Sequence, residues 1–165
     1  MLTPEEKERF TSKLMRFEGT KRNAQGQHIV YCCSAGALTI GYGHNLDALP
    51  VPGITVQSAL SEDQARRLLA ADIHRAEVAL QKTLPFVKKL DAVRYATLLD
   101  MAFNMGIGKL LTFKNTLRDV ERGNYVSAAA RMMKSKWAFQ VGDGPGGRFD
   151  RAEELAQQMR TGQWV

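Results

Sequence analysis

Three side chains able to take part in a hydrolysis stand close together in the N-terminal part of the chain: Glu18, Cys33 and Thr39. A carboxylic acid can protonate a leaving oxygen, and a thiol or a hydroxyl can hold or activate a water molecule. Taken alone, Glu18 would more often be an ordinary exposed charge at the end of a helix. The surrounding sequence therefore decides whether these groups form a site.

The helix that leads to Glu18 has clear start and stop signals. Thr3-Pro4-Glu5-Glu6 is a capping box with proline at the first helical position, and Gly19 is a typical left-handed stop. Apolar side chains share one face at positions i, i+4 and i+7: Phe10, Leu14 and Phe17. Glu18 thus falls in the last turn. There the negative end of the helix dipole, together with any burial, favours the protonated form that a general acid needs.

A short hairpin is predicted to follow this helix. Residues 20–26 are polar and indicate a loop, whereas residues 27–31 indicate a short strand. Residues 37–43 indicate its hairpin partner, with Gly36 as the turn residue that needs a positive φ. The thiol and the threonine hydroxyl would flank the turn and point toward the same cavity as the preceding carboxyl group.

These motifs resemble the active-site hairpin of the phage-type lysozymes, the endolysin muramidases of glycoside hydrolase family 24. The hairpin part of the resemblance consists of Glu18-Gly19, Tyr31, Gly36 and Thr39-Ile40-Gly41-Tyr42-Gly43-His44. Later segments resemble the interlobe helix, the central buried helix and the closing segments of the family: Ser61-Glu62-Asp63-Gln64-Ala65, residues 90–94 and 103–106, Ser135-Lys136-Trp137 and residues 160–164. The order and spacing of these pieces extend the resemblance from about Phe10 to Trp164.

The resemblance implies a role for each of the three groups. Glu18 matches the general acid and Thr39 the threonine that holds the attacking water, but Cys33 stands where the family most often has aspartate. Some family members carry cysteine at this place. Three roles remain open for Cys33: a group that positions the water, a nucleophile that forms a thioglycosyl intermediate, or an inert replacement in a binding-only domain. We favour the first.

The spacing before Cys33 also departs from the family pattern. The family usually has about eight residues between the two positions, whereas fourteen separate Glu18 from Cys33 here. The extra residues fit the loop at 21–27. An inserted polar loop costs little free energy because closure entropy rises only logarithmically with loop length.

Other residues take their expected roles from the resemblance alone. Three match cleft residues of the C-terminal lobe that bind substrate: Phe103, Asn104 and Thr116. Arg151, also expected in substrate binding, matches an arginine that pairs with the catalytic glutamate. His44 and Asp72 match a structural salt bridge. Trp137 is expected in the core, where its indole N–H needs a hydrogen-bond partner.

The composition is that of an ordinary globular protein, with 44% hydrophobic and 24% charged residues among 165. The net charge of +6 favours contact with polyanions, and bacterial wall polymers qualify as well as nucleic acid does. The basic residues are dispersed and lack interleaved aromatics, so no nucleic-acid motif is indicated. No histidine, cysteine and aspartate spacing suggests a metal site, and His28 and His74 have no recognisable partners.

The two cysteines are adjacent and do not form a framework disulfide. Alternation along a strand would place Cys32 in the core and Cys33 toward the cleft. The glycine-rich run at 142–147 indicates a flexible loop and only a weak phosphate-binding candidate, because it lacks the Lys-Ser/Thr ending of a P-loop.

The later elements follow from caps and periodicity. Residues 45–59 indicate a loop, and Ser61 with Gln64 forms a second capping box that starts a helix running to about Lys82. Four more helices are predicted, at 90–105, 113–122, 125–135 and about 148–160. The first is apolar nearly all round and is closed by Gly106 and Gly108, and the third follows an Asn124 cap. The core face of the last consists of Phe149, Ala152, Leu155 and Met159.

The sequence therefore predicts an α+β, mainly α fold: a single two-lobed, lysozyme-like domain over 1–165. The expected parts are a small N-terminal β-hairpin lobe at about 17–60, a joining helix at about 61–82, and a helical C-terminal lobe at about 83–165 that also includes the N-terminal helix.

The implied function is hydrolysis of β-1,4 bonds between N-acetylmuramic acid and N-acetylglucosamine in peptidoglycan, without a cofactor. A phage or prophage endolysin of this kind would act as a monomer without stable membrane insertion. It has no recognisable signal peptide or signal-anchor, so it would stay in the host cytoplasm until a holin lesion admits it to the periplasm. The main alternative is a catalytically degenerate muramidase domain that binds glycan or a protein partner. A basic nucleic-acid-binding protein is a distant third.

Overall fold

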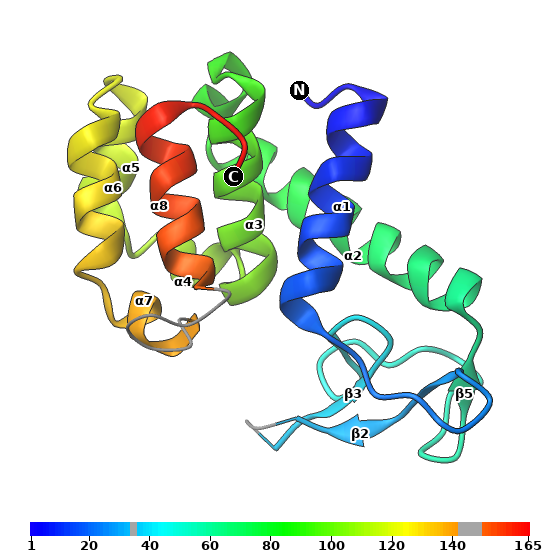
Figure 1. Cartoon of the computed structure of the whole chain (residues 1–165). Coiled ribbons are helices and arrows are strands. Elements are labelled where there is room, and N and C mark those ends of the chain that lie inside the picture. Colours follow the sequence, from blue (N-terminus) through cyan, green and yellow to red (C-terminus); the bar gives the residue numbers. More distant parts are fainter. Residues whose placement is uncertain (34–35, 142–149) are drawn as a thin grey trace. The chain divides into compact units, whose positions relative to one another are not determined.

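The computed structural model describes residues 1–33, 36–141 and 150–165. The chain divides into two compact units, one of Thr11–Arg75 and the other of Met1–Phe10 with Ala76–Val165. Small antiparallel strands lie in the first unit, and the second is helical (Figure 1). The predicted mainly helical α+β class is confirmed.

The first helix, α1, spans Pro4–Glu18 and has the predicted capping box. The backbone N–H of Thr3 donates to the Glu6 carboxylate at 2.8 Å, and the N–H of Glu6 donates to the Thr3 hydroxyl at 3.3 Å. Gly19, with φ of 62°, ends the helix. Glu18 is therefore the last helical residue.

The strands of the unit Thr11–Arg75 form two small antiparallel sheets. One pairs β1 (His28–Ile29) with β5 (Ala59–Leu60). The other has the order β2-β3-β4, made of Tyr31–Cys32, Leu38–Ile40 and His44–Asn45.

Three predictions about these strands were wrong in extent. The hairpin partner expected at 37–43 is only the strand β3, and residues 41–43 form a turn because Gly41 and Gly43 both have positive φ. The single strand expected at 27–31 is split at Val30, because its two halves pair with different partners. The expected loop at 45–59 begins and ends in strands, since Asn45 belongs to β4 and Ala59 to β5. Short strands of two residues carry too little periodicity to be read from sequence.

The long helix α2 spans Glu62–Thr83, close to the predicted range. The N–H of Ser61 donates to the Gln64 side chain at 2.8 Å, and the N–H of Gln64 donates to the Ser61 hydroxyl at 3.2 Å. A 3-10 helix, η1 (Pro85–Lys89), follows, as expected from a proline that cannot continue the preceding helix.

The helical unit is built around α3 (Ala92–Met105), which Asp91 caps by accepting a hydrogen bond from the Arg94 N–H at 3.0 Å. Its side chains from Tyr95 to Ala102 are all buried, as its continuous apolar pattern predicts. Figure 1 shows α3, α8, α6 and α5 side by side, and adjoining pairs of these helices are in contact. The later helices are α4 (Ile107–Leu110), α5 (Lys114–Glu121), α6 (Tyr125–Met133), α7 (Lys136–Val141) and α8 (Arg151–Thr161).

The structure corrects the predicted connections between these helices. Gly106 ends α3, but Gly108 lies inside the unpredicted helix α4. The helix expected at 125–135 ends at Met133, and α7 starts after a break. Asn124 occupies the N-cap position without a side-chain hydrogen bond.

The last helix starts later than predicted, with Asp150 as its N-cap accepting from the Glu153 N–H at 3.1 Å. Of the predicted core face, Ala152, Leu155 and Met159 are buried. Phe149 and the glycine-rich run at 142–147 lie outside the described residues. Among the described helices, none has both the length and the apolar character required to cross a bilayer.

Candidate active site

The Glu18 carboxyl group lies directly against the turn formed by Gly41, Tyr42 and Gly43. A Cβ atom added to Gly43 would stand 2.6 Å from Oε2 of Glu18 and 3.3 Å from its carboxyl carbon. A Cβ atom at this position would force the end of the Glu18 side chain to move, and the φ of 80° at Gly43 also favours glycine. The predicted acid at the end of α1 is thus seated on the backbone of the predicted glycine-rich hairpin.

Cys33 and Thr39 flank the other turn of the hairpin, as predicted. The N–H of Cys33 donates to the Ala37 carbonyl at 2.9 Å, and the Gly36 N–H donates to the Cys33 carbonyl at 2.9 Å. Thr39 is buried, and its hydroxyl donates to the Ala37 carbonyl at 3.2 Å.

Tyr31 is a site residue to which the sequence analysis assigned no role. It pairs with Thr39 across β2 and β3. Burial raises the pKa of its phenol, and electrostatic interaction with Glu18 and Cys33 raises it further. Tyr31 therefore lies near both predicted catalytic residues. Its position two residues before Cys33, the spacing that places side chains on one face of an extended chain, is the signal that would have found it.

The predicted burial of Cys32 in the core was wrong. Cys32 is exposed and Cys33 is partly buried, and the two adjacent cysteines are not joined by a disulfide. The reason is that β2 is an edge strand of only two residues, whose Cys32 pairs with the partly exposed Leu38. The strand β2 ends at Cys32, whose side chain is open to solvent, so alternation along a strand did not predict its burial.

A second polar group surrounds the carboxylate of Glu62 at the start of α2, and we call Arg22, His28, Tyr42 and Glu62 the Glu62 cluster. Oε2 of Glu62 accepts a hydrogen bond from the Arg22 guanidinium at 2.6 Å and lies 2.9 Å from Nε2 of His28. Oε1 accepts from the Tyr42 hydroxyl at 2.8 Å and from Arg66 Nε at 2.8 Å. Four donors thus satisfy both oxygens.

His28 is fully buried in this cluster, so the expectation that it has no partner was wrong. Its Nδ1 is 2.6 Å from the Thr20 hydroxyl, and its ring meets that of Tyr42 edge-on at 4.9 Å. With a proton on Nε2, the ring donates to Glu62 and accepts from Thr20. The two residues that flank the loop at 21–27, Thr20 and His28, are therefore hydrogen-bonded to each other.

His44 and Asp72 form the ion pair that the resemblance implied. Nδ1 of His44 is 2.8 Å from Asp72 Oδ2, and Nε2 is 2.8 Å from the Leu49 carbonyl. The hydrogen bond to Asp72 raises the pKa of His44, against an opposing effect of burial. Arg75 also pairs with Asp72.

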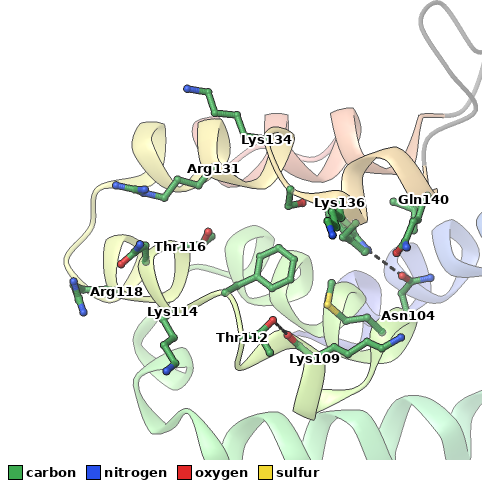
Figure 2. Close-up of a pocket in the computed structure, with 16 residues that line it drawn as sticks. Asn104, Lys109, Thr112, Lys114, Thr116, Arg118, Arg131, Lys134, Lys136 and Gln140 are labelled. Carbon is green, nitrogen blue, oxygen red and sulfur yellow. Dashed lines mark hydrogen bonds between the residues drawn. The ribbon is translucent and has the colours of Figure 1, made fainter.

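The expected substrate contacts lie in the helical unit, where a groove of about 920 Å³ opens between α4, α5, α6 and α7. Asn104 and Thr116 line it, whereas Phe103 is partly buried and is not among its lining residues. Figure 2 shows charged side chains from all four helices around it. Six of the lining residues are cationic: Lys109, Lys114, Arg118, Arg131, Lys134 and Lys136.

Aromatic packing forms one wall of this groove. Trp137 is 5% exposed, and its indole donates to Oδ1 of Asn104 at 3.0 Å, which supplies the partner that a core tryptophan needs (Figure 2). The ring of Phe113 meets that of Trp137 edge-on at 6.5 Å. Asn104 is thereby held in place by its side-chain oxygen.

The model of the family described as "Phage lysozyme" matches residues 15–154. The chain belongs to the phage lysozyme family. It is 33% identical to "Probable T4-type lysozyme 1" of Dictyostelium discoideum over 105 residues, and this matched region covers 62% of this chain and 58% of that relative. It is 26% identical to "Endolysin" of Acyrthosiphon pisum secondary endosymbiont phage 1 over 121 residues, and this matched region covers 73% of each protein.

In this phage lysozyme family member, Arg151 is buried beneath the surface of the helical unit. Its Nε donates to Oδ1 of Asp100 at 2.8 Å, and both side chains are almost fully buried. Asp100 was not predicted, because it lies in the middle of an apolar helix with no motif around it. Within the described ranges, no group of histidine, cysteine and acidic residues is placed to hold a metal ion.

Proposed function

We propose that this protein hydrolyses the β-1,4 bonds between N-acetylmuramic acid and N-acetylglucosamine in peptidoglycan, with Glu18 as the general acid. The observation that carries the proposal is the seating of the Glu18 carboxyl group against Gly43, within the hairpin that also bears Cys33 and Thr39. Membership of the phage lysozyme family supports the same chemistry.

In the proposed reaction, Glu18 gives its proton to the glycosidic oxygen as the bond to the anomeric carbon breaks. A water molecule held by Thr39 and Cys33 attacks that carbon, and its surplus proton passes to the solvent. Glu18, left as a carboxylate, then regains a proton from water. Cys33 takes the place of the aspartate usual in the family, and no cofactor is needed.

Substrate binding is assigned to Phe103, Asn104, Thr116 and Arg151. The cationic groove beside Asn104 and Thr116 suits an acidic polymer, and the peptides attached to muramic acid carry carboxylates. In the cell the protein would act as a monomeric endolysin of a phage or prophage, released from the host cytoplasm to the periplasm through a holin lesion.

The proposal is tested by the loss of turbidity of Gram-negative cells stripped of their outer membrane, with wild type and Glu18→Gln side by side. We expect clearing by the wild type and a loss of at least about 100-fold in the variant, because general acid catalysis contributes roughly 10²–10⁴-fold. If neither protein clears the cells although both are folded and sediment with the wall, the protein is a binding module and the proposal fails.

The same assay tests Cys33, and the chain supplies its own control in Cys32. Cys33→Ala should clear the cells far more slowly, and Cys33→Asp, which restores the usual carboxylate, should retain activity. Cys32→Ala should match the wild type because this thiol is exposed. Clearing by Cys33→Ala at the wild-type rate would remove Cys33 from the mechanism.

A further inference from the structure

The Glu62 cluster joins three segments that are distant in the sequence. Arg22 and His28 come from the loop and strand after α1, and Glu62 comes from the first turn of α2. Tyr42 comes from the turn of residues 41–43, which we call the glycine turn. Burial opposes ionisation of Glu62, but hydrogen bonds from His28, Arg22, Tyr42 and Arg66 outweigh it and hold the pKa of this carboxyl group far below its usual range. The cluster therefore keeps its central charge throughout the neutral pH range.

The glycine turn lies between this cluster and the general acid. At its first residue, a Cβ added to Gly41 would stand 3.5 Å from Cβ of Ala65, so the backbone packs closely on α2. The middle residue, Tyr42, is 6% exposed and donates to Glu62. The third residue, Gly43, is the one that touches the Glu18 carboxyl group.

We infer that the Glu62 cluster positions the general acid: by fixing Tyr42, it holds the backbone of Gly43 against the carboxyl group of Glu18. Tyr42 and Glu62 are then positioning residues, and the lengthened loop that carries Arg22 and leads to His28 is part of the support of the site. This inference rests on the proposed function of Glu18. Its physical basis is that a small displacement of a reacting group lowers the rate steeply without weakening binding to the same extent.

The test is the hydrolysis rate of soluble, uncrosslinked peptidoglycan chains by Tyr42→Phe and Glu62→Gln, assayed well below the lowest Tm of the set. Tyr42→Phe keeps the buried ring and removes only the hydroxyl. We expect kcat to fall about tenfold in each variant with KM within about twofold, because the acid and not the substrate contacts is displaced. The double variant should be no slower than the slower single variant, since the two residues act as one unit.

The matched control is Asp63→Asn, which removes the exposed ion pair between Asp63 and Arg67 in the same turn of α2. It should leave both kcat and KM unchanged. A lowered Tm with wild-type kcat in Tyr42→Phe and Glu62→Gln would make the cluster merely structural and overturn the inference. Failure of the wild type to hydrolyse the chains would instead overturn the proposed function, so the two failures are distinguishable.

Discussion

Gly43 leaves the space that the carboxyl group of the proposed acid, Glu18, occupies. The Glu18 carboxyl group approaches the turn so closely that a single added methyl group at Gly43 would overlap Oε2. Carboxyl position decides whether the proton reaches a leaving oxygen, since general acid catalysis requires hydrogen-bond reach. The chemistry assigned to Glu18 therefore depends on a neighbour that takes no part in it.

Replacement of Gly43 by alanine is expected to abolish most of the lytic activity. The chain offers a control, because Gly43 and Gly53 have the same φ of 80°, but a Cβ at Gly53 would meet nothing within 4 Å. Both Gly→Ala variants should lose about 1–3 kcal/mol of unfolding free energy through backbone strain. Only Gly43→Ala should also lose activity, by about 100-fold. Equal activities at equal stability would show that the contact with Glu18 does not matter.

At the scale of elements, the first turn of α2 organises the strands beside it. It supplies Glu62 to the cluster and Ala65 to the packing of the glycine turn, and a later turn supplies Asp72 to His44 on β4. The helix thereby fixes several short strands that are too small to be stable alone. The capping box of Ser61 and Gln64 marks the start of this helix, so the element that holds these strands can be predicted from local sequence.

Local signals explain which parts of the molecule the sequence could predict. The caps at Thr3 and Ser61 and the buried run of α3 depend on residues within a few positions of each other, and these predictions were confirmed. The pairing of His28 with Glu62 joins residues 34 positions apart, and no spacing rule connects them. The exposure of Cys32 depends on which strand lies at the sheet edge, which a two-residue strand does not reveal.

The pairing of β4 with α2 through His44 and Asp72 predicts a pH-dependent stability. The hydrogen bond to Asp72 raises the pKa of His44 above its ordinary value of 6.5, although burial and Arg75 oppose the rise. A raised folded-state pKa stabilises the protein fully below about pH 6.5, and this contribution is lost as the pH rises through the folded-state pKa.

Asp72→Asn should therefore lower the free energy of unfolding by about 1–3 kcal/mol near pH 6, and by less near pH 9. Urea unfolding of both proteins at several pH values measures the difference. Asp63→Asn, which breaks an exposed pair, should change the unfolding free energy by less than about 1 kcal/mol. A loss in Asp72→Asn that is independent of pH would mean that the charge of His44 contributes nothing.

At the scale of the whole molecule, the net charge is +6, and several of the basic residues gather at one groove. Six basic residues line the groove of the helical unit, and none of its described lining residues is acidic. The positive charge of Arg131 is paired with Asp119, which lies 2.7 Å away and does not line the groove. A concave surface with charges of one sign raises the local concentration of an acidic polymer more than dispersed charges do.

The groove, more than the net charge, is expected to set affinity for the wall. Lys114→Gln with Arg118→Gln removes two exposed charges from its lining, and Lys88→Gln with Lys89→Gln removes two exposed charges from η1. Both pairs lower the net charge equally. At low salt the first pair should raise KM for wall fragments about fivefold with little change in kcat, since exposed charge contacts are each worth about 0.2–1 kcal/mol. The second pair should change KM by less than about twofold, and high salt should remove the difference because it screens exposed charges. Equal increases in KM for the two pairs would assign the effect to net charge alone, and a salt-independent increase would assign it to lost packing.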